Sequence, residues 1–331
     1  MTSRINPPPA LYIGSVPRPE RQLIQRVRSL AQASKPTLRT LITGIGDDCA
    51  VLRPPAGHEL LVTTDFSLEG VHFRREWHPP ESVGHRCLTR GLSDIAAMGG
   101  QPLACFLSLG LPAGLPQSWV DRFYRGLLRL ASEHNVALAG GDTAQSPAGV
   151  LADIMVLGSI ARGKAVLRSG AKPGDRLYVT GRIGLGGSTV RRLYAGEKIR
   201  PSAASGYFYP QPRLSAGHKL QRLASAMIDI SDGLTTDLSH ICEESNVGAL
   251  VFQTEIPIHR NTNLNDALSG GDDYELLFTS SKRVPREIAG LTITEIGEII
   301  DRPGMWLQDS NGRTRPLKAK GWEHFSADTR P

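Results

Sequence analysis

Short segments that place aspartate next to small residues recur along this chain. Most of them follow an apolar run, as Asp65 follows residues 60–62 and Asp229 follows residues 226–228. An acid at the end of a buried strand, with glycine or serine beside it, leaves the sheet at the edge where ligands usually bind. The five segments are Gly46-Asp47-Asp48, Thr63-Thr64-Asp65, Ser93-Asp94, Gly140-Gly141-Asp142 and Asp229-Ile230-Ser231-Asp232-Gly233.

Several carboxylates in one pocket would repel one another strongly unless cations lay between them. Hard oxygen ligands of this kind suit Mg²⁺, which keeps part of its water shell and bridges substrate phosphates. The residues therefore predict a magnesium-dependent phosphoryl-transfer site.

Each segment, taken alone, also has an ordinary structural explanation. Gly46-Asp47-Asp48 and Gly140-Gly141-Asp142 are typical of turns. Thr63-Thr64-Asp65 and Ser231-Asp232 are typical of helix caps and related turns. Asp94 can form an i,i+4 ion pair with Arg90 on one helix.

Other nucleotide-binding motifs are incomplete. Residues 181–188 are glycine-rich, but the acidic partner that a dinucleotide loop needs about 20 residues later is missing, so we interpret them as a strand-to-helix turn. The chain contains no Walker-type loop ending in Gly-Lys-Ser or Gly-Lys-Thr, and no kinase His-Arg-Asp or Asp-Phe-Gly set. The predicted phosphate chemistry therefore belongs to neither major nucleotide-binding class.

Composition narrows the class of protein. The chain has 331 residues, which favours two domains, and a net charge of +6 from dispersed basic residues. No nucleic-acid-binding signature and no apolar run of about 20 residues is present, so we expect neither a nucleic-acid partner nor a membrane span. The proline-rich N-terminus does not resemble a signal peptide. Four widely spaced cysteines favour reduced, partly buried thiols in a cytoplasmic protein.

Helices and strands are predicted in mixed order in both halves, which predicts an α/β (α+β) fold of two domains. We place an irregular tail at residues 1–20, an N-terminal domain at 21–162 and a C-terminal domain at 163–331. The main predicted helices are residues 20–33, 79–98, 118–135, 215–223 and 234–244. The main predicted strands are residues 59–65, 105–111, 137–139, 152–160, 177–180, 226–230, 247–252, 274–279 and 292–300.

Six segments, in this order and spacing, resemble the thiamine-monophosphate kinase family of the aminoimidazole-ribonucleotide-synthetase-like superfamily. They are residues 44–52, 63–65 with Glu69-Gly70-Val71-His72-Phe73, 92–99, Gly140-Gly141-Asp142-Thr143, 228–234 and Asp273-Tyr274-Glu275-Leu276. The resemblance implies an N-terminal α/β domain that binds ATP and Mg²⁺ and forms a homodimer through its sheet, with a C-terminal α/β domain beside it. It implies ATP-dependent phosphorylation of thiamine monophosphate to thiamine diphosphate.

The resemblance also assigns roles to individual residues. The implied magnesium ligands are Asp48, Thr63, Thr64, Asp65, Asp94, Asp142, Asp229 and Asp232, with Asp65, Asp94 and Asp142 central to catalysis. The implied ATP contacts are Tyr124, Gly141, Asp142, Arg168 and Ser231. The implied contacts to thiamine monophosphate are His72, Asp272 and Trp322.

Two departures from the family pattern leave alternatives open. The family usually has Glu where this chain has Asp272, and it usually continues Thr-Arg where this chain has Ala144-Gln145. The alternatives are another ATP-using enzyme of the same superfamily, or a non-catalytic protein that binds thiamine phosphate or nucleotide.

Overall fold

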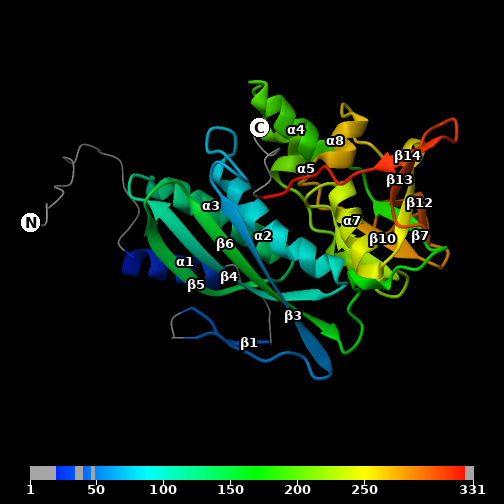
Figure 1. Ribbon diagram of the computed structural model, residues 1–331. Helices are drawn as coiled ribbons and strands as arrows, with labels where there is room; N and C mark the ends of the chain where they lie inside the picture. Colours follow the sequence, from blue (N-terminus) through cyan, green and yellow to red (C-terminus); the bar gives the residue numbers. More distant parts are fainter. Residues whose placement is uncertain (1–19, 34–39, 46–48, 325–331) are drawn as a thin grey trace, which may run out of the picture.

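The computed structural model describes residues 20–33, 40–45 and 49–324. Figure 1 shows two α/β halves side by side, with helix α2 (Pro80–Ala97) running from the first half towards the second. Of the predicted N-terminal tail only Glu20 is described, and it begins helix α1 (Glu20–Ala33). Asp47 and Asp48 lie outside the described residues, so the predicted role of Asp48 stays a prediction.

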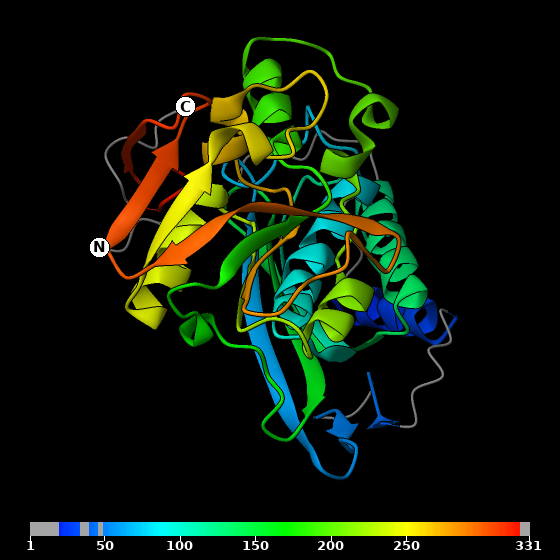
Figure 2. The same cartoon turned by 90° about the vertical axis from the view of Figure 1, so that its right-hand side faces the viewer.

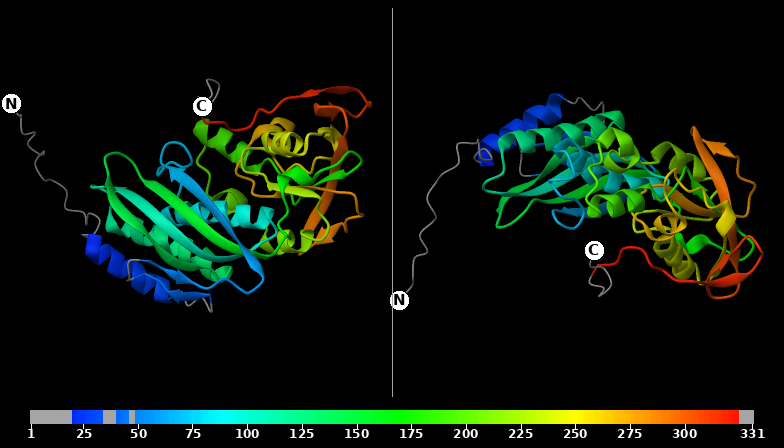
Figure 3. Two further views of the ribbon diagram at one scale, coloured as in Figure 1. Left: turned by 60° about the horizontal axis from the view of Figure 1, so that its bottom comes forward. Right: turned by 90° about the horizontal axis from the view of Figure 1, so that it is seen from above.

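The N-terminal half contains a four-stranded sheet in the order β3-β6-β4-β5. Helix α2 and helix α3 (Gln117–Glu133) cover one face of this sheet, and no described helix covers the other face (Figure 3). The strands are β3 (His58–Leu68), β4 (Gln101–Pro112), β5 (Ala137–Ser146) and β6 (Leu151–Ala161), and a short pair, β1 (Leu41–Thr43) and β2 (Val51–Leu52), lies near β5.

Helix α2 is buried on almost every side because it lies between the sheet, α3 and the C-terminal half. Glycine permits its close contact with α3. A Cβ atom added to Gly84 would lie 2.0 Å from the Phe123 carbonyl oxygen, and one added to Gly126 would lie 1.9 Å from that of Glu81. The two helices therefore pack backbone against backbone at these positions.

Successive side chains of β3 point to opposite faces of the sheet. Thr63 and Asp65 face helix α2, whereas Leu60, Val62 and Phe66 lie on the open face with 51%, 59% and 54% of their surface exposed. This strand was predicted to end at Asp65, and the strand that begins at residue 137 was predicted to end at residue 139; both ends were wrong. β3 continues to Leu68 because its pairing with β6 continues, and β5 likewise continues along β4 to Ser146.

The C-terminal half contains a larger mixed sheet in the order β14-β13-β9-β12-β7-β10-β8, with β11 paired to β12 (Figure 2). Its strands are β7 (Arg176–Thr180), β8 (Ala226–Asp229), β9 (Gly248–Phe252), β10 (Leu276–Ser280), β11 (Glu287–Ile288), β12 (Leu291–Ile300), β13 (Gly304–Gln308) and β14 (Thr314–Leu317). Its helices are α4 (Leu185–Tyr194), α5 (Ser205–Phe208), α6 (Leu214–Leu220), α7 (Leu234–Ser245) and α8 (Leu264–Ser269), with single 3-10 turns at Arg168–Gly170, Pro201–Ala204 and Gln253–Glu255.

The two halves share one hydrophobic core. Leu92 and Val156 of the N-terminal half belong to the same buried cluster as Leu220 and Phe278 of the C-terminal half. Helix α6 approaches α2 so closely that a Cβ atom on Gly217 would lie 2.1 Å from the Ala96 carbonyl oxygen. The predicted α/β class is confirmed, while the boundary at residues 162 and 163 stays a prediction. Among the described residues, no helix combines the length and the apolar character needed to span a bilayer.

Candidate active site

Two carboxylates meet between the inner face of β3 and helix α2. Asp65 lies on β3, Asp94 lies on α2, and Thr63 Oγ1 donates a hydrogen bond to Asp94 Oδ2. Burial, followed by the charge of Asp94, raises the pKa of Asp65 to about 7. Burial also raises the pKa of Asp94. The fold thus brings Thr63, Asp65 and Asp94 together, as their predicted role requires.

The C-terminal half adds two carboxylates to this pair. Asp229 ends β8, one residue before the predicted end of this strand, and its Oδ2 accepts a hydrogen bond of 2.6 Å from Ser93 Oγ. Burial, followed by the charge of Asp94, raises the pKa of Asp229 to about 8. Burial raises the pKa of Asp232, whose charge in turn acts on Asp65. Asp65, Asp94, Asp229 and Asp232 are called the acidic cluster below.

Asp237, which the sequence analysis did not select, holds the loop that carries two of these acids. Its Oδ2 accepts hydrogen bonds from the backbone N–H groups of Ser231, Asp232 and Gly233, at 3.1, 3.2 and 3.1 Å. Neither Ser231 nor Asp232 caps helix α7, so that explanation of the segment was wrong. The side chain of Asp232 is therefore not used as a helix cap, because a residue inside α7 binds the loop instead.

Two arginines bring positive charge to the acidic cluster. The exposed side chain of Arg168 lowers the pKa of Asp94 and of Asp229 by its charge. Arg90 acts in the same way on Asp65 and Asp232. Arg168 was a predicted ATP contact, whereas Arg90 was considered only as an ion-pair partner of Asp94. That interpretation of Arg90 was wrong, because its ion pair is made with Asp272.

His72 and Trp322 lie on one side of the acidic cluster and are linked through His324. The ring centroids of His72 and His324 are 5.6 Å apart, and those of Trp322 and His324 are 5.5 Å apart. The Trp322 backbone N–H donates to the Asp232 carbonyl at 2.9 Å. Burial, followed by the charge of Arg90, lowers the pKa of His72 to about 3, and its Nδ1 accepts from the Leu68 N–H at 3.0 Å. His72 is therefore a neutral imidazole.

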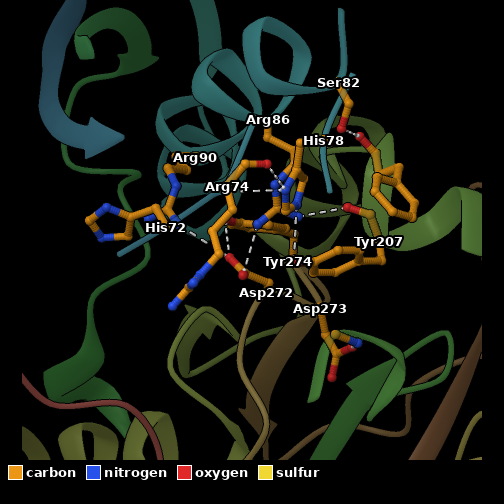
Figure 4. A network of polar contacts seen from close by, with 12 residues as sticks. His72, Arg74, His78, Ser82, Arg86, Arg90, Tyr207, Asp272, Asp273 and Tyr274 are labelled. Atoms are coloured by element: carbon orange, nitrogen blue, oxygen red, sulfur yellow. Dashed lines mark hydrogen bonds and ion pairs between the residues drawn. The ribbon is translucent and has the colours of Figure 1, made fainter. Parts of the chain in front are cut away.

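The carboxylate of Asp272 lies in a buried polar network (Figure 4). Arg86 Nη2 donates to Oδ2 at 2.8 Å, Arg90 Nη2 donates to Oδ1 at 3.2 Å, and the Tyr274 hydroxyl donates to Oδ1 at 2.7 Å. Burial opposes the charge of Asp272, but Arg86 and Arg90 hold its pKa well below the ordinary value. Asp272 is thus an ionised carboxylate that protein groups already bind.

Three predicted site residues on strands of the N-terminal sheet lie away from the acidic cluster. Thr64 is exposed on the open face of the sheet. Gly141 pairs with Leu107, and Asp142 pairs with Ser108, on the strand β5 at the far edge of the sheet from β3. Three strand spacings separate β3 from β5, which corresponds to about 14 Å. Within one chain, Asp142 is therefore not part of the acidic cluster.

The need for glycine at position 141 has a local cause. A Cβ atom there would lie 1.9 Å from the Leu107 carbonyl oxygen, and the φ angle is +147°. The neighbouring strand β4 by itself therefore excludes a side chain at position 141, and the predicted ATP contact of Gly141 stays a prediction.

Two further predicted ATP contacts have different surroundings. Tyr124 is buried in the core of the N-terminal half, near the thiols of Cys87 and Cys105 and outside the acidic cluster. Ser231 lies in the loop of the acidic cluster, where its carbonyl accepts from the Asp272 N–H at 2.8 Å. The structure therefore brings Ser231 to the candidate site but leaves Tyr124 away from it.

The chemistry of the acidic cluster fits Mg²⁺. Within residues 20–33, 40–45 and 49–324, no three His, Cys, Asp or Glu side chains are already arranged to hold a metal ion by themselves. Mg²⁺ does not require such a cage, because it is commonly bound by one or two carboxylates together with waters and substrate phosphates. Burial, followed by the charge of Asp94, raises the pKa values of Asp65 and Asp229, and a divalent cation would stabilise the ionised form of both carboxylates.

The fold and this site define a protein of the AIR synthase related class. Residues 46–160 match the family described as AIR synthase related protein, N-terminal domain, and residues 172–309 match AIR synthase related protein, C-terminal domain. Within this class the chain belongs to the thiamine-monophosphate kinase family, which confirms the resemblance seen in the sequence.

Two curated relatives show the extent of the match. The chain is 33% identical over 324 residues to the thiamine-monophosphate kinase of Synechococcus elongatus, an alignment that covers 90% of this chain and 98% of that protein. It is 36% identical over 305 residues to the enzyme of that name from Salmonella typhimurium, with 86% of this chain and 92% of that protein covered.

Solved structures agree with this assignment. The crystal structure of thiamine-monophosphate kinase from Stenotrophomonas maltophilia is similar with a TM-score of 0.77 and 35% identity, covering 86% of this chain and 95% of that one. AaThiL complexed with AMPPCP and TMP is similar with a TM-score of 0.74 and 31% identity, covering 82% and 89%. The hydrogenase maturation protein HypE in complex with ATP has a TM-score of 0.74 at only 19% identity, which shows a shared fold alone.

Proposed function

We propose that this protein transfers the γ-phosphoryl group of ATP to thiamine monophosphate and forms thiamine diphosphate. One observation carries the proposal: the Trp322 N–H donates to the carbonyl of Asp232 in the acidic cluster, and the Trp322 ring is linked through His324 to His72. Carboxylates that bind metal-associated phosphates are thus adjacent to aromatic side chains that can pack against an organic ring. The names of the relatives, and the AMPPCP and TMP bound to AaThiL, support the same reaction.

Different residues of the chain would bind the metal ion, ATP and the acceptor. Asp65, Asp94, Asp229 and Asp232 would hold Mg²⁺, and Arg168, whose charge acts on Asp94 and Asp229, would contact ATP together with Ser231. Neutral His72 and the Trp322 ring would face the acceptor. When bound, Mg²⁺ supplies positive charge that neutralises the phosphates and aligns the donor with the acceptor.

The acceptor of this reaction is a phosphate, which is already largely ionised near pH 7. No side chain then has to remove a proton from it. The main obstacle is repulsion between two anions, which amounts to roughly 4 kcal/mol for unit charges about 4 Å apart at an effective dielectric of about 20. The task of the acidic cluster and the arginines is therefore to bind and orient charge.

The proposal includes a homodimer formed through the open face of the N-terminal sheet. Exposed apolar side chains on one sheet face are typical of an interface, and Leu60, Val62, Phe66, Leu151 and Met155 are such side chains here. Thr64 lies on this face as well, and the strand register places Asp142 in the same row as Phe66. These two predicted ligands would then lie near the contact between copies. A cytoplasmic location is also proposed, and the unpaired state of Cys49, Cys87, Cys105 and Cys242 supports it.

The test is an incubation of the purified protein with ATP and thiamine monophosphate, with Mg²⁺ in one sample and a chelator in the other. We expect thiamine diphosphate and ADP in equal amounts, and only in the sample with Mg²⁺. If both ligands bound but no diphosphate formed, the protein would be a non-catalytic binding protein. ATP consumption that did not depend on thiamine monophosphate would favour another enzyme of the superfamily.

A further inference from the structure

Arg90 lies between the acidic cluster and His72, the two parts of the proposed active site. It lies on helix α2 one turn before Asp94, and only 14% of its side chain is exposed. Its charge acts on Asp65 and Asp232 on one side and on His72 on the other. Figure 4 shows Arg90 beside His72, whereas Arg86 lies deeper, against Tyr207.

The hydrogen bonds of Arg90 leave part of its guanidinium available. Nη2 donates to Asp272 Oδ1, and within the described part of the chain its Nε and Nη1 donate to no other group. Arg86 differs, because its Nη1 donates to the Tyr207 carbonyl at 2.6 Å while its Nη2 donates to Asp272. A nearly buried guanidinium with free N–H donors is suited to bind an anion that enters the site.

The position of Arg90 limits which anion this can be. The acidic cluster repels anions unless metal ions are bound there, and the aromatic side chains of His72 and Trp322 offer no charge to a phosphate. An acceptor whose ring packs near Trp322 would carry its phosphate towards the acidic cluster. Arg90 is close to both groups, since its charge acts on Asp232 of the acidic cluster and on His72, and a guanidinium matches the geometry of phosphate oxygens.

We infer that Arg90 binds the phosphate group of the acceptor, and that Asp272 is a positioning residue that fixes Arg90. The inference rests on the proposed function and deepens it. It adds a positioning role to the predicted role of Asp272, because both oxygens of this carboxylate accept hydrogen bonds from Arg86, Arg90 or Tyr274.

The backbone around Asp272 is built to keep this carboxylate in place. Asp272 and Tyr274 have left-handed φ angles of +64° and +52°, which are uncommon for residues other than glycine. The Asp272 N–H donates to the Ser231 carbonyl at 2.8 Å, and the Tyr274 N–H donates to the Ile230 carbonyl at 2.8 Å. The loop that holds Arg90 is thus attached to the segment that carries Asp229 and Asp232, so the guanidinium and the acidic cluster keep a fixed relation.

The experiment compares wild type with Arg90→Gln, Arg90→Lys and Asp272→Asn. In Arg90→Gln we expect the KM for thiamine monophosphate to rise roughly 10- to 100-fold, the range expected for hydrogen bonds from a charged group, while the KM for ATP stays unchanged. The KM of Arg90→Lys for thiamine monophosphate should lie between those of wild type and Arg90→Gln, because lysine keeps the charge but lacks the paired N–H donors of the guanidinium. Asp272→Asn should raise the same KM. In a double variant with Arg90→Gln it should raise this KM little further, because both changes break the same Arg90–Asp272 ion pair.

The control variant is Asp273→Asn. Asp273 is a buried neighbouring carboxylate, but it accepts from the N–H groups of Gly184 and Gly186 and not from Arg90. It should lower the melting temperature and leave the KM for thiamine monophosphate unchanged. If this KM rose as much in Asp273→Asn as in Asp272→Asn, the effect would come from a general loss of structure around the loop, and the inference would be overturned.

Calorimetric binding in the presence of Mg²⁺ and a non-hydrolysable ATP analogue keeps the inference separate from the proposed function. Arg90→Gln should weaken binding of thiamine monophosphate and leave binding of unphosphorylated thiamine unchanged, whether or not wild type turns over. Equal loss for both ligands, or no loss for either, would overturn the inference. Wild-type turnover with an unchanged KM in folded Arg90→Gln would overturn it and leave the proposed function intact. If Arg90→Gln does not fold, Arg90→Lys and Asp272→Asn decide in the same assay.

Discussion

Aspartates of this chain have opposite electrostatic properties because their neighbours differ. Burial beside Asp94 raises the pKa of Asp65 to about 7, whereas the guanidinium groups of Arg86 and Arg90 hold the pKa of Asp272 well below its ordinary value. Within the protein alone, Asp65 lacks enough neighbouring positive charge to stabilise its ionised form, whereas Asp272 has it from Arg86 and Arg90. We therefore propose a cation-binding role for Asp65, Asp94 and Asp229, whereas Asp272 forms ion pairs within the protein.

The variant Asp94→Asn tests the role of the acidic cluster. We expect kcat to fall by roughly 100-fold or more, because one charge that would hold Mg²⁺ is lost. The melting temperature in chelator should stay the same or rise, because a buried carboxylate among like charges is removed. Turnover and thermal unfolding measure the two effects, with the exposed Asp301→Asn as control. Near-normal turnover of Asp94→Asn at saturating Mg²⁺ would contradict the assignment.

A second prediction at this scale concerns His78, which is 2% exposed and shares a 3.1 Å hydrogen bond with the Tyr207 hydroxyl. Burial, followed by the charge of Arg86, lowers the pKa of His78 to about 4 from its ordinary value of 6.5. The unfolded chain binds a proton at a higher pH than the folded protein does. The contribution of His78 to stability is therefore complete above about pH 6.5 and is lost as the pH falls towards 4.

The free energy of unfolding, measured by urea denaturation across this pH range, tests the prediction. We expect His78→Gln to remove a pH-dependent part on the order of 3 kcal/mol, and the difference between the curves isolates His78 because other groups titrate in both proteins. The exposed His58→Gln should follow the wild-type curve. Parallel curves for wild type and His78→Gln would show that the protonation of His78 does not differ between the folded and unfolded states.

At the scale of elements, helix α2 connects the chemistry of the two halves. It presents Arg90, Ser93 and Asp94 to the site, and Ser93 bonds to Asp229 of the C-terminal half. Its side chains also bond to the backbone of α5, where Ser82 donates to the Phe208 carbonyl at 2.7 Å. A displacement of α2 would therefore disturb the acidic cluster and the Arg90 site together.

The contact between α2 and α3 offers a test of this dependence. Gly126→Ala should lower the free energy of unfolding by about 1–3 kcal/mol, because the added methyl group would meet the Glu81 carbonyl and force the helices apart. The control is Gly114→Ala, where a Cβ atom would meet no atom within 4 Å. Chemical denaturation of both variants measures the difference. Equal stability of the two variants would mean that α2 and α3 separate at little cost.

At the scale of the whole molecule, the open face of the N-terminal sheet gathers exposed apolar side chains such as Leu60, Val62 and Phe66. We expect light scattering to give the mass of a dimer for wild type and a shift towards monomer for Val62→Asp, because a charge would be buried without a partner. Val62 is 59% exposed in one chain. The control is Ile24→Asp on α1, which is 40% exposed and outside this face. A dimer that survives Val62→Asp, or a monomeric wild type, would refute the proposed interface.

The sequence predicted most of the elements because their signals are local. The amphipathic spacing of α3 and the apolar run before Asp229 are visible over a few residues, and both elements form close to the predicted positions. The strand ends at Asp65 and at residue 139 could not be predicted in this way. Each is set by pairing with a strand far away in the chain, such as Asp65 opposite Ile154.

The amino-acid order alone determined the family, the α/β class and the acids Asp65, Asp94, Asp229 and Asp232, because these depend on residue types in short segments. Only the tertiary structure decided which of these groups meet. It placed Thr64 and Asp142 apart from the acidic cluster through strand register, and it joined Asp272 to Arg86, 186 residues earlier in the chain. Burial and charge around a side chain come from elements distant in sequence, so the pKa values of Asp65 and Asp272 and the partner of Arg90 become visible only after folding.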